Sequence, residues 1–375
     1  MEWIQWRDQF PILSRKVYLN SCSLGALSRR AEERVLQFQE DWHNCGASAW
    51  YEIWLNRLTE LRSRVAGMLG AELAEIALSH SVSAALATIS SSLDYTRRNR
   101  VVVAELDFPT LAYQWMVKPG VEVVRVPSDD GATVSLERFR EVVDDRTALI
   151  ATSHVFYATG AIQDLKGLAA IAHEAGALFL CDGYQGIGQV PVDVHAADVD
   201  IYIGGPLKWL LGGPGLSYLY VRGDLIERLE PETTGWFAAD DQFGFDLTHF
   251  EFKPDARRFE LGTPALHMVH SALGGQEIID EVTVPRIRER NQYLTERLID
   301  RARAAGFRIR CAPSAERRSA IVMIAANDPH RIVNTLATQG IIVDARPGHV
   351  RVSPHFYNTE SEVDLVVDRM VELGA

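Results

Sequence analysis

Three polar residues stand where apolar, strand-like segments end. His154 follows the segment TALIATS, Asp182 ends ALFLCD, and Lys208 comes just beyond DIYIGG. Ligands of open α/β sheets bind outside the carboxyl ends of the strands, so we expect these side chains to share one site. Each residue also has a plainer explanation when taken alone: a buried histidine with satisfied hydrogen bonds, a turn or capping aspartate, and a solvated lysine.

A lysine and a carboxylate at one edge of a sheet suit the chemistry of pyridoxal 5'-phosphate (PLP). In that chemistry the lysine forms a Schiff base, and the carboxylate pairs with the protonated pyridine nitrogen. The ring then accepts electrons from a bond that breaks at the α-carbon of an amino acid. The lysine amine, once substrate displaces it, can move protons. The three residues therefore predict a PLP-dependent enzyme that acts on an amino-acid substrate.

The elements that position these residues follow from the hydrophobic pattern. Apolar, β-branched runs of strand length alternate with helical patterns over residues 101–205, which is typical of βαβ units and a largely parallel sheet. Apolar residues from Leu165 to Ala175 recur with helical spacing, and Gly176 ends that pattern. The run LSYLYVRG (216–223) is expected to return beside the DIYIGG strand.

The last quarter of the chain predicts a second, smaller unit. A long helical stretch begins near Glu277 and leads into short apolar runs, with a further helix near 328–340 and a final one near 359–373. We therefore expect an α/β protein with two domains. Residues 1–276 form an N-terminal segment plus the large PLP-binding domain, and residues 277–375 form a small C-terminal α+β domain. The N-terminal segment should pack against both.

The composition excludes several other classes of protein. The 375 residues are 47% hydrophobic and 23% charged, as in ordinary globular domains. A formal net charge of −12 argues against a nucleic-acid partner, which requires clustered positive charge. The sequence has no apolar run long enough to cross a membrane, and MEWIQWRDQF does not have the pattern of a signal peptide. Four scattered cysteines favour the cytoplasm and predict no metal site.

Several motifs together resemble the class V aminotransferase family. They are TSHVFYATGAIQDL (152–165), CDGYQGIGQVPVDV (181–194) and GGPLKWLLGGPGLSYLYVR (204–222). The likeness extends from YLNSCSLG near the N-terminus to VRVSPHFYNTESEVD near the C-terminus. This family includes cysteine desulfurases, kynureninases and isopenicillin N epimerase-like proteins. The resemblance implies the fold type I architecture of PLP-dependent transferases, with PLP as the cofactor.

The resemblance also implies which residues hold the cofactor. Lys208 corresponds to the Schiff-base lysine and Asp182 to the partner of the pyridine nitrogen, so both are expected to be catalytic. The other expected cofactor contacts are Ser81, Val82 and Ser83 at the phosphate, Phe108 and His154 at the ring, and Gln185 at the phenolic oxygen. The sequence would look the same if Ser81 only capped a helix and Phe108 only packed in the core, without contact to the cofactor.

Further residues are implied to contact a second subunit or the substrate. Thr263 and Trp236 correspond to residues near the cofactor phosphate of a neighbouring subunit, which implies a homodimer. Arg351 corresponds to the arginine that binds the substrate α-carboxylate, a task that suits its planar guanidinium. Asn20 and Tyr157 are the other expected substrate contacts.

The sequence departs from the family pattern at positions that bear on function. Many members carry a small polar residue and a histidine just before the lysine, and these help to hold the phosphate or the ring. Here the two positions are Gly205 and Leu207, so part of the phosphate grip must come from elsewhere. Tyr157 replaces the usual asparagine. The stretch IIVDARPGHVR has no cysteine and Cys311 lies far upstream, so persulfide-type cysteine desulfuration is not expected.

An aminotransferase is the expected activity, with three PLP-dependent alternatives left open. These are β-elimination or C–S lyase chemistry, kynureninase-like hydrolysis, and epimerisation. A nicotinamide-dependent oxidoreductase fits less well, because the glycines of GYQGIGQ have the reverse of the dinucleotide-binding spacing. A catalytically silent binding protein also fits less well, because Lys208, Asp182, Gln185 and Arg351 are all retained.

Overall fold

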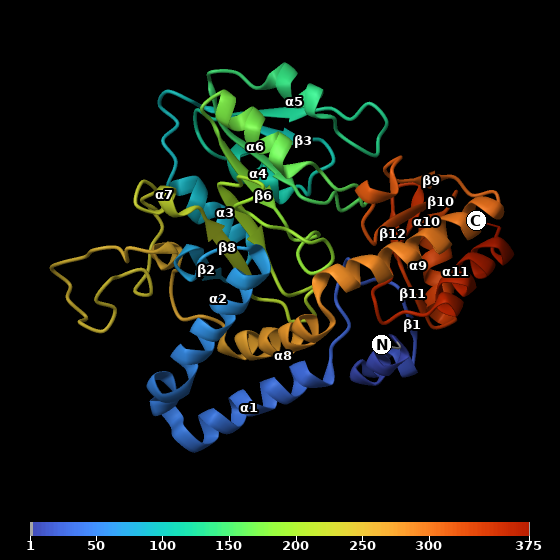
Figure 1. The fold of residues 1–375 in the computed structure, drawn as a ribbon, viewed down its shortest axis with the longest axis horizontal. Coiled ribbons are helices and arrows are strands. Elements are labelled where there is room, and N and C mark those ends of the chain that lie inside the picture. The colour runs from blue at the N-terminus through green and yellow to red at the C-terminus, as the bar shows by residue number, and fades with distance from the viewer. Residues whose placement is uncertain (1–2, 375) are drawn as a thin grey trace.

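A mostly parallel sheet forms the centre of the larger unit (Figure 1). The computed structural model describes residues 3–374. Within them the sheet has seven strands in the order β2-β8-β7-β6-β5-β3-β4, and β8 is antiparallel to both of its neighbours. The strands are β2 (Ile76–Ser79), β3 (Arg100–Ala104), β4 (Glu122–Val126), β5 (Thr147–Ser153), β6 (Leu178–Asp182), β7 (Ile201–Gly204) and β8 (Ser217–Val221). The strand runs predicted from the sequence are confirmed as β3 to β8, and β8 lies beside β7 as expected.

Helices cover both faces of this sheet because its strands are apolar on both sides. Val101 and Val103 of β3 face one hydrophobic cluster, whereas Val102 and Ala104 face the other. Helices α3 (Val82–Ser91), α4 (Thr110–Met116) and α7 (Gly223–Ile226) pack on the first side. The second side is covered by α2 (Leu55–Leu69), α5 (Leu136–Val142), α6 (Leu165–Glu174) and α8 (Leu266–Val282).

The smaller unit is built on a four-stranded antiparallel sheet in the order β12-β13-β10-β9. Its strands are β9 (Ile309–Arg310), β10 (Val322–Ala325), β12 (Asp344–Arg346) and β13 (His349–Val352). Helices α9 (Val284–Ala304), α10 (Pro329–Thr338) and α11 (Glu360–Glu372) accompany this sheet, and their apolar residues share its hydrophobic cluster. The expected α+β character and the two C-terminal helices are confirmed.

The single long helix expected from near Glu277 is divided in the structure: α8 begins earlier, at Leu266, and ends at Val282, and α9 starts at Val284. Most residues of α8 are buried, including Gly274, which packs against the backbone of Ala31 in α1 (Arg29–Cys45). A helix that is buried nearly all round shows no amphipathic stripe, so its first half has no helical signature in the sequence. The predicted division between residues 276 and 277 lies within this helix.

The N-terminal segment packs against both units, as predicted. Its strand β1 (Val17–Tyr18) pairs in parallel with β11 (Ile341–Ile342) of the smaller unit, and Asn20 forms a bridge with Ser353. Helix α1 then crosses to α8 (Figure 1). No helix among residues 3–374 is long and apolar enough to span a bilayer. The short helical turns are η1 (Trp3–Gln9), η2 (Pro11–Ser14), η3 (Gly46–Ser48), η4 (Trp50–Trp54), η5 (Leu73–Glu75), η6 (Ala256–Phe259) and η7 (Ala315–Arg317).

Candidate functional site

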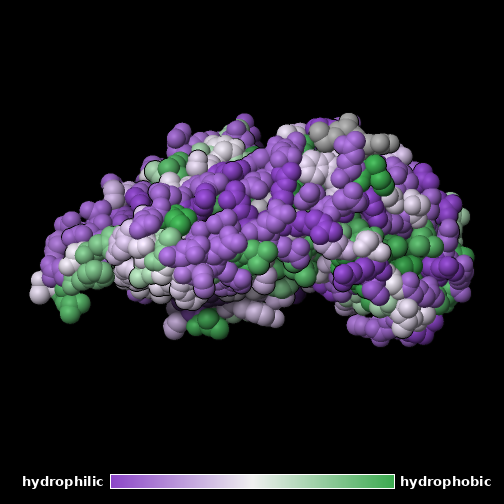
Figure 2. Space-filling view, turned by 90° about the horizontal axis from the view of Figure 1, so that it is seen from below, coloured by the Kyte–Doolittle hydropathy of each residue, from purple (hydrophilic) through white to green (hydrophobic). Residues whose placement is uncertain are grey.

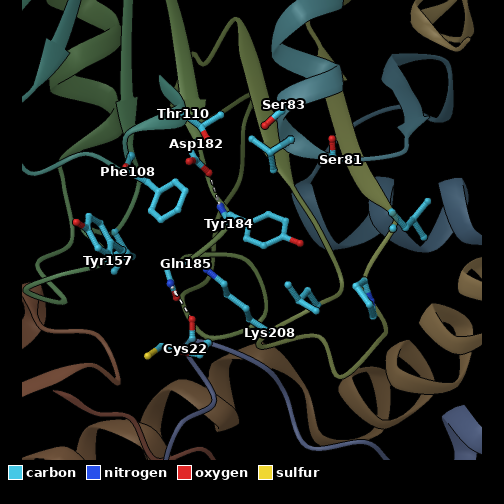
Figure 3. Close-up of a pocket in the computed structure, with 18 of the residues that line it drawn as sticks. Cys22, Ser81, Ser83, Phe108, Thr110, Tyr157, Asp182, Tyr184, Gln185 and Lys208 are labelled. Carbon is cyan, nitrogen blue, oxygen red and sulfur yellow. Dashed lines mark hydrogen bonds between the residues drawn. The ribbon is translucent and has the colours of Figure 1, made fainter. Parts of the chain in front are cut away.

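A cavity of about 500 Å³ lies at the carboxyl edge of the large sheet (Figure 3). Strands β2, β3, β5, β6 and β7 all end at this edge, because β2 is parallel to β7 through the intervening antiparallel β8. The structure thereby brings together residues that are far apart in the sequence. The predicted site residues that line the cavity are Ser81, Val82, Ser83, Phe108, Tyr157, Asp182, Gln185, Lys208 and Arg351.

Lys208 extends into this cavity from the loop that follows β7. Its Nζ lies 4.9 Å from the centre of the Tyr184 ring. Burial, together with the nearby guanidiniums of Arg351 and Arg346, lowers the pKa of Lys208 to about 8, against the opposing effects of Cys22 and Asp182. A substantial fraction of the amine is therefore neutral near physiological pH, which is the form that attacks a carbonyl group.

Asp182 ends β6 and is 8% exposed. Its Oδ1 accepts a hydrogen bond from the backbone N–H of Tyr184 at 2.9 Å (Figure 3). Burial raises the pKa of this carboxyl group, and the Tyr184 N–H and the Lys208 ammonium limit the rise by favouring the charged form. A cationic group placed beside Asp182 would hold it ionised.

The side-chain amide of Gln185 has a fixed orientation. Its Oε1 accepts from the indole Nε1 of Trp209 at 2.9 Å, and its Nε2 donates to the carbonyl oxygen of Cys22 at 2.9 Å. An indole N–H can only donate, so the amide cannot be flipped without losing this bond. One N–H of Gln185 is thus left to donate to a ligand in the cavity.

The N-terminus of α3 forms another wall of the cavity. Ser81 caps the helix, with its Oγ accepting from the N–H of Ala84 at 3.1 Å. The N–H groups of Val82 and Ser83 belong to the first turn and have no acceptor within the helix. Such amides, together with the helix dipole, favour an anion such as phosphate. The N-cap explanation and the phosphate explanation of this segment are therefore compatible.

Arg351 lies in β13 with only 2% of its surface exposed. Its Nη1 donates to the carbonyl oxygen of Tyr157 at 2.9 Å, and its Nη2 donates to Ser23 Oγ at 2.7 Å and to Asp344 Oδ2 at 2.5 Å. Arg346 pairs with the same Asp344 oxygen at 2.9 Å. Burial opposes ionisation of Asp344, but the two guanidiniums hold its pKa below the usual range. Two cations share one carboxylate here, which leaves a net positive charge.

Two other predicted residues do not line the cavity in the described part of the chain. Asn20 forms the backbone bridge to Ser353 in the smaller unit. His154 is buried, with its Nδ1 3.4 Å from the hydroxyl of Tyr202, and burial lowers its pKa to about 4. His154 is thus a neutral core histidine in this structure, and its contact with the cofactor ring stays a prediction.

Thr263 and Trp236 also lie outside the cavity lining. The carbonyl oxygen of Thr263 is 3.1 Å from Nε2 of His80, a residue that does line the cavity. Trp236 is 39% exposed and contacts the rings of Phe237 and Phe243. Both residues are predicted to lie near the cofactor phosphate of a second subunit. That contact involves another chain, so it stays a prediction.

The structure adds cavity residues that the sequence analysis did not select. Tyr184 lies between Asp182 and Gln185 in a motif already noted. Its position at the same strand end is the signal that could have identified it. Other additions lie within motifs or beside residues already noted, but they were not themselves selected. They include Cys22 and Ser23 of the N-terminal segment, His80, Thr110 and Arg346. Cys311 lines a separate groove, formed mostly by the smaller unit together with Asp130 and Ala132.

Comparison with known proteins identifies the family. The model of the family described as aminotransferase class V matches residues 29–366. The chain belongs to the class V aminotransferase family. An uncharacterized aminotransferase of Bacillus subtilis (strain 168), YcbU, is 31% identical over 98% of this chain and 96% of its own length. A kynureninase of Bacillus thuringiensis subsp. konkukian (strain 97-27) is 31% identical over 92% of this chain and 86% of its own length.

Solved structures of this family share the fold. The protein C-DES, solved as a variant with glycine covalently linked to its PLP cofactor, matches with a TM-score of 0.90 and 21% identity over 98% of this chain and 99% of its own. The class V chain described here is accordingly a fold type I protein with PLP as its cofactor. Its cavity fits that molecule, since it contains a partly neutral lysine, a buried carboxylate and free helix amides.

Proposed function

We propose that this protein is a PLP-dependent aminotransferase that acts on an amino acid with a single carboxylate in contact with Arg351. The observation that carries the proposal is the common cavity of Lys208, Asp182 and Arg351, which combines a reactive amine, a buried anion and a carboxylate-binding cation. The similarity to an aminotransferase over nearly the whole length of both chains supports it.

Each of the cavity residues has a distinct task in this proposal. Bound PLP supplies an electron sink for bond cleavage at the substrate α-carbon. Nζ of Lys208 would hold the cofactor covalently and, as a free amine, would move a proton at the substrate α-carbon. Asp182 would accept a hydrogen bond from the pyridine N–H, and Gln185 would donate one from its free N–H to the phenolic oxygen. The amides of Val82 and Ser83 bind the phosphate.

The substrate side of the cavity is set by Arg351 and its neighbours. Arg351 and Arg346 carry two positive charges against the single negative charge of Asp344. One further carboxylate would neutralise this remaining positive charge. The site therefore favours a substrate that places only its α-carboxylate here over one that places two acidic groups here. The rings of Phe108 and Tyr157 pack edge to face with centres 5.2 Å apart and form an apolar wall for the cofactor and substrate.

We also propose that the protein is a homodimer. The segment that follows Trp236 extends away from the large unit (Figure 1), and its tip carries apolar side chains at the left end of the molecule in Figure 2. Leu247 is fully exposed and Phe245 is 71% exposed. Contiguous exposed apolar surface marks association sites, and a second copy is the partner that the predicted roles of Trp236 and Thr263 require. The molar mass in solution, measured by light scattering, tests this; Leu247→Glu should lower it towards that of a monomer.

Kynureninase-like hydrolysis is the second candidate, because a kynureninase is also 31% identical, over 92% of this chain. The two activities differ in their products. The purified protein with PLP is incubated with amino donors and a 2-oxo acid, and in parallel with kynurenine or with cysteine conjugates. A new amino acid formed in equal amount to a new 2-oxo acid supports transamination. Formation of alanine and an aromatic amine would instead indicate kynureninase-like hydrolysis. Formation of pyruvate and ammonia would indicate β-elimination.

Two lysine variants serve as controls for this experiment. Lys208→Ala should lose both the visible absorbance of covalently held cofactor and the activity. Lys166→Ala, on the exposed side of α6, should keep both. Activity that survives in Lys208→Ala would contradict the assignment of the reactive amine.

A further inference from the structure

Gly205 and Tyr184 compete for one volume next to Lys208. A Cβ atom placed on Gly205 would lie 2.4 Å from Cε2 of Tyr184 and 3.1 Å from the carbonyl oxygen of Leu216. Real Cβ atoms do not approach carbon this closely, so no side chain fits at position 205 while the tyrosine ring is there. The glycine that departs from the family pattern is thus explained by the tyrosine that lies against it.

Tyr184 is held firmly in this place. Its backbone N–H donates to Asp182 at 2.9 Å, which anchors it to the end of β6. Its ring centre is 4.9 Å from Nζ of Lys208. Figure 3 shows its hydroxyl end directed towards the side of the cavity where Ser81 lies, and both residues line that cavity. The tyrosine therefore extends from the carboxylate end of the cavity towards the amides of α3.

The hydroxyl of Tyr184 is an available donor. No hydrogen bond joins it to another group within residues 3–374. Burial, with a smaller contribution from Asp182, raises the pKa of this phenol, so it stays protonated at physiological pH. A protonated phenol on a cavity wall, without a protein acceptor, can donate to a bound anion.

We propose that the Tyr184 hydroxyl donates a hydrogen bond to the phosphate of PLP, in place of the side-chain hydroxyl that Gly205 lacks. Leu207, the other departure before Lys208, also brings no donor. The tyrosine thus restores one donor from a strand end that is more than twenty positions away. The inference rests on the proposed place of the phosphate at α3, and it holds whichever reaction the enzyme performs.

Tyr184→Phe separates this role from a packing role, because the variant keeps the ring and removes only the hydroxyl. The full-length protein is freed of cofactor, and its dissociation constants for PLP and for pyridoxal, which has no phosphate, are measured by absorbance titration. We expect the PLP constant to rise about tenfold, as for the loss of a hydrogen bond to a charged acceptor. The pyridoxal constant should change less than about twofold. An equal loss for both ligands, or no loss for either, overturns the proposal.

Tyr218→Phe is the matched control. Tyr218 is 1% exposed, its hydroxyl has no hydrogen-bond partner within the described residues, and it does not line the cavity. Removing that hydroxyl should leave both constants unchanged. If the unaltered protein binds PLP and pyridoxal equally well, the placement of the phosphate at α3 fails as well. If it prefers PLP and Tyr184→Phe keeps that preference, only the role of Tyr184 fails.

A double variant tests whether a hydroxyl at position 205 can replace the hydroxyl of Tyr184. Tyr184→Ala removes both ring and hydroxyl and should bind PLP more weakly than the unaltered protein. Adding Gly205→Ser to it places a hydroxyl in the vacated volume, and the affinity for PLP, but not for pyridoxal, should recover. A double variant that binds PLP no better than Tyr184→Ala contradicts the exchange.

Discussion

Arg351 and Arg346 are held by one carboxylate oxygen, Oδ2 of Asp344, at 2.5 and 2.9 Å. This shared oxygen fixes the direction of both guanidiniums in the absence of any ligand. It also sets the charge that would face the carboxylate of the proposed substrate, because two cations face one anion. A site prepared in this way loses little conformational freedom when a carboxylate binds.

Arg351→Lys should weaken substrate binding while keeping the charge. The lysine ammonium cannot reproduce the planar fork that donates to Tyr157, Ser23 and Asp344 together, so its direction is lost. We expect KM for the amino-acid substrate to rise about tenfold or more, with a smaller change in kcat. Arg331→Lys, at an exposed position in α10, is the control. Steady-state kinetics with an unchanged KM would show that Arg351 does not bind the substrate.

Capture of PLP by the cofactor-free protein should depend on pH with a midpoint near the Lys208 pKa of about 8. Only the neutral amine attacks the aldehyde, so the rate rises with pH and levels off above the pKa. Arg346→Ala removes a cation that lowers this pKa, and the midpoint should move upwards. Stopped-flow absorbance over a pH series checks both statements. A midpoint at the ordinary lysine value would refute the effect of burial.

Asp182→Asn should uncouple cofactor binding from turnover. The asparagine oxygen can still accept from the Tyr184 N–H, but it no longer carries the charge that stabilises a protonated ring nitrogen. We expect kcat to fall on the order of 100-fold while PLP stays bound. Kinetics and the absorbance of the bound cofactor are measured on the same sample. Normal turnover in this variant would mean that another residue faces the ring nitrogen.

Gly25→Ala should disturb the loop that carries Lys208. A Cβ at position 25 would lie 2.1 Å from the carbonyl oxygen of Lys208, so the backbone has to move. We expect a loss of about 1–3 kcal/mol in the free energy of unfolding, together with slower capture of PLP. Gly67→Ala in α2, where no atom lies within 4 Å, is the control and should stabilise the protein by about 0.5–1 kcal/mol. Urea titrations compare the two, and equal stabilities would contradict the close contact.

Strands β3 to β8 of the large sheet, and the site edge, could be predicted from the sequence because their signals are local, whereas β2 was not predicted. Each predicted strand contains an apolar run; Asp182 ends one such strand, and Lys208 comes shortly after another. The first half of α8 gave no signal, since a helix buried on all sides lacks a polar face. Ser23 and Arg346 could not be predicted as neighbours of Arg351, because their meeting depends on how distant segments pack.

The N-terminal segment links the two units at the place where the reaction is proposed to occur. Strand β1 is hydrogen-bonded to β11 of the smaller unit, and a few residues later Gly25 donates from its N–H to the carbonyl oxygen of Leu207, beside Lys208. Between them, Ser23 accepts from Arg351. The segment therefore connects the smaller unit to the backbone next to Lys208, so we expect a displacement of the smaller unit to be transmitted to the loop that carries Lys208. Deleting the residues before α1 would remove these contacts, so we expect the deletion to weaken PLP binding even though these residues precede the family match.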